Sequence, residues 1–446
     1  MDRLESDSDA SGVPDGPSPS AHVAVICSGY PPIAHVCGTR GSQMALGLSN
    51  LGLRVTVITA DWRPSDVERP RSVEERGVTV VRVDPREWYP TFNPTEHPFS
   101  LSPPSTVTVV RRLRSARGML GWGPWRAWAR RALRELLAVH ARSPINVVWA
   151  IDDDGPHQVA ASFHRRARVP WVADFKDPWD GPKQNMLWPV WWFVTWRRLQ
   201  TCSALTETCR AQGELDARFG RPWHVVWSGY DPEAMRQAKP VRVSSRFTLG
   251  YFGNVIPAYH DLPHAARMLR ACMCNSDGAP EAELHVFGYS ASTWREALAR
   301  EKVVGLLHEH GFVPRDEAFS RMKGADVLLM LPVTKAANSG VLGVKELEYL
   351  ASGTPVLCVG RLLPELRNAI GQSRQLVEAE DEGQAVRFLR EEYLAFSSGA
   401  SSPRRGPVNA PSVAACSWPA QARRLADILQ SAMPMGGESA KGRCAG

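Results

Sequence analysis

Long apolar runs are absent from the sequence. No stretch of about 18 residues is both uncharged and apolar, so no membrane-spanning helix is expected. The first 20 residues are polar, acidic and rich in Ser, Pro and Gly, and they lack the charged and apolar regions of a targeting peptide. We expect residues 1–20 to form a disordered leader. These absences favour a cytoplasmic protein.

Paired cysteines and metal-ligand spacings are lacking as well. The nine cysteines are odd in number and irregularly spaced, and Cys272 and Cys274 have no second pair to complete a zinc site, so we predict reduced thiols. The net charge of +7 comes largely from Arg spread over many segments, which suits anionic partners or a solvated surface. No basic run with interleaved aromatics resembles a nucleic-acid-binding module, and no nucleic-acid partner is expected.

Apolar, β-branched runs alternate with helical patterns in two consecutive blocks. The first block opens with the strand HVAVICS at 22–28, followed by a glycine-bearing loop and a helical pattern at 42–51. These segments begin a βαβ unit, and in open α/β sheets ligands bind at such a strand-to-helix loop. Residues 233–246 are polar and lack a strand pattern, which indicates a linker. A second alternating block starts at 247. The pattern predicts an α/β protein with two doubly wound domains.

The expected boundaries follow from this alternation. We predict an N-terminal domain at 21–232, the linker at 233–246, a C-terminal domain at 247–396, a loop at 397–416, a last helix at 417–432 and a disordered tail at 433–446. Strands are expected at 22–28, 54–59, 78–83, 146–150, 171–175, 224–227, 247–252, 283–287, 303–306, 326–331 and 354–359, and helices at 42–51, 125–141, 159–168, 197–219, 262–274, 292–300, 316–324, 343–352, 382–394 and 418–429.

The segment KELEYLASGTP at 345–355 resembles the donor-site signature K-x-x-E-Y-L-A-x-G-x-P of a subgroup of family-4-type GT-B glycosyltransferases. Other stretches resemble the same subgroup in the same order, so that the resemblance covers about residues 21–430. They are GYPP, GTR and LSNLGLRVTVIT near the start, VPWVADFKDPW, SGYDPE, GYFGN, GFVPRDEAFSRMKGADVLLML and the terminal SWPAQARRLADIL. The resemblance implies a GT-B fold: two Rossmann-like domains facing across a cleft, with the C-terminal helix crossing back to the N-terminal domain.

The donor segment also has a physical interpretation of its own. A small-residue loop enters a helix, and the free N–H groups and positive dipole end of that helix attract phosphate. Glu348 is placed to accept hydrogen bonds from a ribose diol, and Lys345 to pair with a diphosphate; alternatively the two form a surface ion pair worth at most about 0.5 kcal/mol. The resemblance adds Gly253 and Asn254, where a glycine lets the backbone approach the diphosphate. The loop residues are Ser339, Gly340, Val341, Leu342 and Gly343.

On the acceptor side the resemblance points to a loop in the first domain and to two strand ends. The loop consists of Gly38, Thr39, Arg40 and Gly41. Arg40 either contacts acceptor or phosphate, or is a surface charge at a helix start. Lys176 replaces a histidine that many relatives carry and is a candidate catalytic residue. Asp177 and Asp154 are further candidate catalytic residues, expected to contact the acceptor.

Some positions depart from the family pattern. Gly340 stands eight residues before Glu348, where family members usually carry a first glutamate that touches the donor sugar. His260 and Asp261 stand where an Arg/Lys pair often clamps the diphosphate. These departures leave two alternatives open, a catalytically inactive partner protein and a GT-B nucleotide-sugar epimerase.

The run Asp152–Asp154 resembles the metal site of the other glycosyltransferase fold, GT-A. Its position after a strand favours loop carboxylates facing the cleft, so no metal and no cofactor are expected. The resemblance implies retaining transfer from a nucleotide sugar to a hydroxyl of a polysaccharide, lipid-linked or small-molecule acceptor.

Two Trp/Arg clusters fit either buried helix faces or peripheral contact with a membrane. The second interpretation would place the protein at the inner face of the membrane. Their tryptophans are Trp122, Trp125 and Trp128, and Trp188, Trp191, Trp192 and Trp196.

Overall fold

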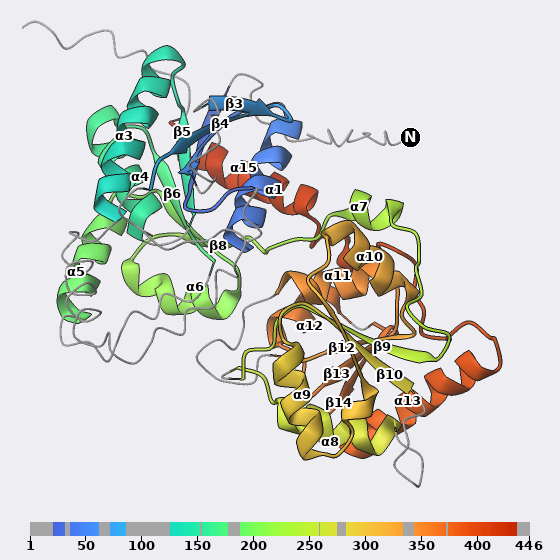
Figure 1. Ribbon diagram of the computed structural model, residues 1–446. Coiled ribbons are helices and arrows are strands. Elements are labelled where there is room, and N and C mark those ends of the chain that lie inside the picture. The colour runs from blue at the N-terminus through green and yellow to red at the C-terminus, as the bar shows by residue number, and fades with distance from the viewer. Residues whose placement is uncertain are drawn as a thin grey trace, which may run out of the picture.

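The protein forms two α/β domains, as the sequence pattern predicts (Figure 1). In each domain a largely parallel sheet carries helices on both faces. The computed structural model describes residues 21–31, 36–61, 72–85, 125–151, 154–176, 188–257, 259–273, 282–332, 343–371 and 373–434.

The N-terminal sheet is parallel except for one edge strand, β3, which runs antiparallel to β4. Over the described residues its order is β3 (Ser72–Glu75), β4 (Val78–Val83), β2 (Arg54–Ala60), β1 (His22–Cys27), β5 (Val147–Ile151), β6 (Trp171–Phe175), β7 (Ala204–Glu207) and β8 (Trp223–Val225). Its helices are α1 (Val36–Asn50), α3 (Trp125–Arg142), α4 (Asp154–Ala167), α5 (Trp188–Leu199) and α6 (Arg210–Asp216), with a 3-10 turn, η2, at Ala217–Phe219.

The C-terminal sheet is parallel throughout the residues described. Its order is β11 (Leu307–Gly311), β10 (Ala282–Phe287), β9 (Phe247–Phe252), β12 (Val327–Met330), β13 (Val356–Val359) and β14 (Leu376–Ala379). Its helices are α8 (Leu262–Met273), α9 (Ala291–Arg300), α10 (Arg315–Gly324), α11 (Val344–Ser352), α12 (Pro364–Ile370) and α13 (Glu382–Ser397), with a 3-10 turn, η3, at Val304–Leu306. Three further helices are α7 (Pro232–Gln237), α14 (Pro411–Ala414) and α15 (Trp418–Ala432).

Burial on both faces explains why the central strands are continuous apolar runs. In β1, Val23 and Val25 belong to the core that α1 and α15 cover, whereas Ala24 and Ile26 belong to the core under α3 and α4. The C-terminal sheet has two cores in the same way, one on each face. Because these strands are parallel, the described strands of each sheet, apart from β3, have their carboxyl ends at the same edge.

Two chain segments cross between the domains and touch one another. Tyr230 and Ser417 form an isolated parallel bridge, in which the Trp418 N–H donates to the Tyr230 carbonyl at 2.9 Å. Gly229 lies so close to the returning segment that a Cβ there would be 2.6 Å from the Trp418 nitrogen. The last helix, α15, packs on α1 of the N-terminal domain, which places the C-terminal helix as expected (Figure 1).

Several element predictions are wrong. Residues 303–306 form η3 rather than a strand, and the strand of that region is β11, whose polar sequence LHEHG gives no apolar signal. The expected helix at 197–219 is interrupted by β7. The linker predicted at 233–246 contains most of α7, which was not predicted and which buries Met235. The elements β3, β7, α5, α12, α14 and β14 were not predicted either.

The described cysteines are reduced thiols, as expected; they are Cys27, Cys202, Cys209, Cys272, Cys358 and Cys416. Residues 1–20, expected as a leader, and residues 435–446 of the tail expected at 433–446 lie outside the described residues.

Candidate functional site

The carboxyl edge of the C-terminal sheet has a strip of backbone without side chains. Gly253 follows β9 with φ +110°, and Gly288 follows β10 with φ +129°, conformations that side-chain-bearing residues rarely adopt. A Cβ on Gly288 would stand 2.8 Å from the Gly253 carbonyl oxygen. The strand ends are therefore packed backbone against backbone. The Gly253 and Gly288 N–H groups donate to the Phe287 and Gly311 carbonyl oxygens, so these glycines offer a ligand phosphate space rather than free N–H groups.

Helix α11 is fixed against this strip by one side chain. The Tyr349 hydroxyl accepts a hydrogen bond from the Phe252 N–H at 2.7 Å, and Tyr349 is fully buried. The N-cap residue of the helix is Gly343, which has no side chain to accept a hydrogen bond from the first N–H groups. The helix ends at Gly353, which adopts a left-handed conformation. The amino end of α11 thus lies near the end of β9.

Lys345, in the first turn of α11, lies beside the glycine strip. Its Nζ donates to the Tyr251 hydroxyl at 3.2 Å and stands 5.1 Å from the centre of the Tyr251 ring. A Cβ on Gly253 would be 3.7 Å from its side chain. Burial alone would lower the pKa of Lys345, but Tyr251 and Glu346 outweigh it and leave the pKa above its ordinary value. Lys345 is therefore a fixed positive charge suited to a diphosphate.

His260, which stands where the family pattern has a basic residue, does not supply a second positive charge. Burial, with the charge of Lys345 nearby, lowers the pKa of His260 to about 4. Its Nδ1 accepts a hydrogen bond from the Ile256 N–H at 3.0 Å. At neutral pH the imidazole is uncharged.

Glu348 pairs with Arg315 rather than with Lys345. The Arg315 guanidinium donates to Glu348 Oε1, and the same guanidinium lies 5.4 Å from the ring of Phe319. Burial raises the pKa of Glu348 above its ordinary value, although Arg315 opposes this. The alternative of a surface ion pair between Lys345 and Glu348 is wrong, because Glu348 is buried and forms its ion pair with Arg315 of α10.

Arg315 is a candidate site residue that the sequence reasoning missed. It begins α10, and its Nε has no hydrogen-bond partner among the described residues. The only signal was its place in the segment GFVPRDEAF, directly after a proline that precedes a helix. The structure brings it to Glu348 from 33 residues away in the chain.

Glu346 is a second buried carboxylate at the start of α11. A Cβ on Gly343 would stand 2.1 Å from Glu346 Oε2, and that oxygen has no hydrogen-bond partner among the described residues. A carboxylate here is stabilised by the positive end of the helix dipole. It also lies where a phosphate would be attracted, so its charge opposes an anionic ligand.

An aromatic pair lies at the same edge of the sheet. Tyr289 follows Gly288, and Phe312 follows β11; their rings stack with centroids 5.9 Å apart, and their exposed fractions are 55% and 57%. The Tyr289 N–H donates to the side-chain oxygen of Asn254 at 3.2 Å. Exposed stacked rings of this kind offer a planar surface to a nucleobase.

The prediction that Gly38, Thr39, Arg40 and Gly41 form a loop is wrong, since all four lie in α1. Arg40 is fully buried and makes a two-pronged pair with Asp174 at 2.9 and 2.7 Å. It also donates to the Val226 carbonyl oxygen at 3.0 Å. Such a pair is stable only because its hydrogen bonds are satisfied, and Arg40 joins α1 to β6 instead of facing solvent.

Other predicted site residues lie partly or wholly outside the described residues. Lys176 directly follows β6 and is half-buried, and its carbonyl oxygen accepts a hydrogen bond from Thr208 Oγ1 at 2.8 Å. Asp154 begins α4, but its side chain is not described. Asp152, Asp153, Asp177, Ser339, Gly340, Val341 and Leu342 lie outside the described residues.

Glu207 is a buried carboxyl group close to the Arg40–Asp174 pair that the sequence reasoning also missed. Neither of its oxygens has a hydrogen-bond partner among the described residues. Burial, reinforced by the nearby carboxylates of Asp216 and Asp174, raises the pKa of Glu207 well above its ordinary value.

Comparison with known proteins gives a clear result for the fold. No family model and no curated protein matches the sequence. Among solved structures, the trehalose-6-phosphate synthase OtsA aligns over 92% of this chain and 99% of its own, with a TM-score of 0.64 and 12% identity. The sucrose-phosphate synthase from Thermosynechococcus elongatus covers 92% and 98%, with a TM-score of 0.59 and 13% identity. The Anabaena protein HepE in complex with UDP-glucose covers 92% and 99%, with a TM-score of 0.57 and 11% identity. The chain has the GT-B fold of these glycosyltransferases, as the resemblance implied.

Proposed function

We propose that the protein is a glycosyltransferase that takes a sugar from a nucleotide sugar bound at the carboxyl edge of its C-terminal sheet. The observation that carries this is the side-chain-free strip at Gly253 and Gly288 with the charge of Lys345 beside it. A diphosphate is favoured where the absence of side chains leaves room beside a fixed cation, and both conditions are met there. The GT-B fold and the UDP-glucose complex of HepE support the same assignment.

In this proposal each residue of the site has a separate task. Lys345 and the amino end of α11 hold the diphosphate. They stabilise the negative charge that develops on the diphosphate as it leaves the sugar. Glu348 accepts the ribose hydroxyls, with Arg315 holding its carboxylate in place. Tyr289 and Phe312 provide a surface for the base. The family-4-type assignment rests on the donor segment at 345–355 and belongs to the proposal.

We infer retaining transfer without a metal. The acceptor hydroxyl attacks from the face that the phosphate leaves, and that phosphate takes the proton. Asp154, at the start of α4, and Asp177 contact the acceptor, and Lys176, directly after β6, is a further catalytic candidate. No cofactor is required, because the nucleotide sugar is a substrate and the positive charge at the diphosphate is supplied by Lys345.

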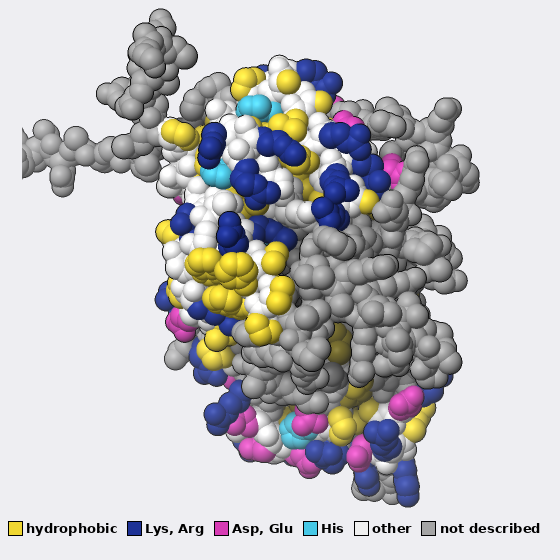
Figure 2. All heavy atoms as spheres, turned by 90° about the vertical axis from the view of Figure 1, so that its left-hand side faces the viewer, with side chains coloured by type: hydrophobic (Ala, Val, Ile, Leu, Met, Phe, Trp, Pro, Cys, Tyr) yellow, Lys and Arg dark blue, Asp and Glu magenta, His cyan; other side chains and the backbone are white. Residues whose placement is uncertain are grey.

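The acceptor side suggests a lipid-linked substrate at a membrane surface. Figure 2 shows a cluster of hydrophobic side chains next to many Lys and Arg side chains, on the side of the molecule that carries α3 and α5. Val190 and Phe193 of α5 are 40% and 50% exposed. Exposed arginines close to them in the chain or on the adjoining helices are Arg130, Arg134, Arg142, Arg165, Arg166 and Arg197.

The tryptophans themselves do not all support this contact. Trp128 is fully buried, so for that residue the interfacial interpretation is wrong. Trp192 and Trp196 stack on one another and pack against the core. No helix of the described residues is both long and apolar enough to cross a bilayer. The proposed contact is therefore peripheral, made by the apolar side chains of α5 and by arginine attraction to acidic lipid.

A turnover assay tests the function. The purified chain is incubated with UDP-, GDP- and ADP-sugars, with and without lipid-linked and free-sugar acceptors, and the released nucleotide and the sugar product are measured. We expect acceptor-dependent release of a nucleoside diphosphate. Conversion of the donor without acceptor would instead indicate an epimerase, and binding of donor without any turnover would indicate an inactive partner protein.

A further inference from the structure

Four ionisable side chains gather at the edge of the C-terminal sheet, away from the proposed donor site. Glu283 and His285 come from β10, and His308 and His310 come from the edge strand β11. The parallel register pairs His285 with His308. Because alternate residues of a strand share a face, Glu283 and His285 lie on the same side of the sheet.

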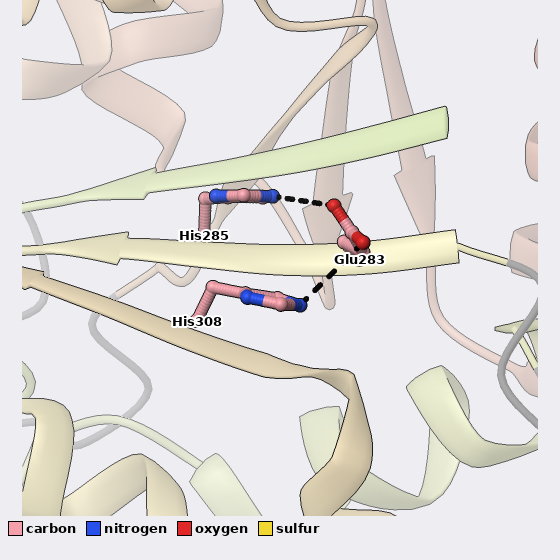
Figure 3. Close-up of side chains that lie close together, drawn as sticks. All are labelled: Glu283, His285 and His308. Atoms are coloured by element: carbon pink, nitrogen blue, oxygen red, sulfur yellow. Dashed lines mark hydrogen bonds and ion pairs between the residues drawn. The ribbon is translucent and has the colours of Figure 1, made fainter. Parts of the chain in front are cut away.

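The ligand atoms of Glu283, His285 and His308 converge. Figure 3 shows the two imidazoles nearly parallel, with a nitrogen of each directed at the Glu283 carboxylate. The distances are 3.1 Å from His285 Nε2 to Glu283 Oε2 and 3.6 Å from His308 Nε2 to Glu283 Oε1. One ligand atom from each residue falls within 4.8 Å of the others. Ligands of a tetrahedral zinc ion are separated by roughly 3.3 Å, given bonds of about 2.0 Å.

The other nitrogen of His285 already has a partner that fixes the ring. His285 Nδ1 lies 2.8 Å from His310 Nε2. When His285 Nε2 donates its lone pair to a metal, Nδ1 carries the proton and donates it to His310 Nε2. A ligating histidine commonly has such a second partner, which sets its tautomer and ring orientation. His310 in turn stacks on Phe287 at 4.4 Å, so the arrangement is held by packing.

The surroundings leave one side of the group open. The His285 side chain is only 4% exposed, whereas that of His308 is 44% exposed, so an ion reaches the group from the His308 side. Arg246 is the nearest competing cation, with its Nε 3.8 Å from Glu283 Oε1, but its side chain is 63% exposed and can move into solvent. Arg321 of α10 also contributes a positive charge near His285 and weakens cation binding.

We propose that Glu283, His285 and His308 form a binding site for a zinc-like divalent cation that joins β11 to β10. Two imidazole nitrogens and one carboxylate oxygen are ligands that zinc, cobalt and nickel accept, whereas magnesium and calcium prefer oxygen alone. Water completes the coordination on the open side. Glu283 is the second residue of β10 and the donor site lies at the carboxyl ends of the strands, so the ion is structural and takes no part in glycosyl transfer.

Zinc titration of the full chain in the presence of a phosphine reductant tests the site. Metal-free wild type, His308→Ala and the control His224→Ala are titrated with Zn²⁺ by calorimetry, and Co²⁺ absorption reports the coordination. His308 is exposed, so its replacement leaves the core intact; His224 is likewise an exposed histidine on an edge strand. We expect one equivalent of Zn²⁺ to be lost in His308→Ala and retained in His224→Ala.

His310→Ala gives a second measure, because removing the partner of a ligating histidine typically weakens metal binding about 10- to 100-fold. Zinc should also raise the melting temperature of wild type but not of His308→Ala. The proposal is overturned if His308→Ala binds zinc with the stoichiometry and affinity of wild type, or if the wild type binds none. Neither result depends on whether the protein transfers a sugar.

Discussion

Glu348 offers the sharpest test of how the nucleotide is held. In the proposed complex its carboxylate accepts hydrogen bonds from the ribose, and hydrogen bonds to a charged group are worth about 1.5–3 kcal/mol. Glu348→Gln keeps the shape and removes the charge, so we expect nucleoside diphosphates to bind about 10- to 150-fold more weakly. Arg315 is left without its partner, but its side chain is 34% exposed and reaches water, so the loss of stability should be small.

Calorimetric titration with UDP, GDP and ADP measures the affinities, and thermal melting without nucleotide measures the fold. Glu346→Gln is the matched control, since Glu346 is also a buried carboxylate on α11. Its negative charge opposes a phosphate at the helix start, so this change should leave affinity unchanged or increase it. Unchanged affinity of Glu348→Gln for every nucleotide, with an intact fold, would refute the ribose role. Equal losses in both variants would mean that damage to α11 is the cause.

Three further outcomes are expected. Activity should survive EDTA even if the melting temperature falls; loss of turnover that manganese or magnesium restores would contradict metal-independent transfer. Glu207→Gln should be more stable than wild type at pH 8 and should lose this advantage towards pH 4. The reason is that a carboxyl group whose pKa is raised by folding destabilises the folded protein once the pH exceeds the ordinary pKa of glutamate. A variant that thermal melting shows to be less stable than wild type at pH 8 would mean that the carboxylate is needed. Phe193→Ser should reduce pelleting with anionic liposomes at low salt, whereas Leu394→Ser, a change at an even more exposed residue on α13, should not. Equal pelleting by both variants and by wild type would exclude α5 as the membrane contact.

The fold was predictable because its central strands are buried on both faces. Strands such as β1 and β9 read as apolar runs, and their alternation with helical patterns identifies two doubly wound domains. The same signal fails at the sheet edge. Strand β11 has the sequence LHEHG and gains its structure from pairing with β10, whereas the apolar residues just before it form η3. The local sequence pattern does not reveal an edge strand that forms only because it pairs with a neighbouring strand.

In the candidate site, the sequence predicted the relative placement only of residues that are close together in the chain. The donor segment places Lys345 and Glu348 on one short helix, and both lie there. Their actual partners come from afar: Tyr251 is 94 residues from Lys345, and Arg315 is 33 residues from Glu348. Arg40 shows the opposite error. It was expected either to contact acceptor or phosphate or to be a surface charge, but a buried partner 134 residues away makes it part of a core ion pair.

The most direct test of the central claim compares nucleotides that differ in phosphate number. Wild type and Lys345→Met are screened by thermal shift against UMP, UDP, GMP and GDP. If the diphosphate lies between the glycine strip and Lys345, a diphosphate should stabilise the wild type more than its monophosphate does, and Lys345→Met should lose that difference while remaining folded. Absence of stabilisation by any nucleotide, or an equal diphosphate preference in Lys345→Met, would contradict a donor site at this edge of the sheet.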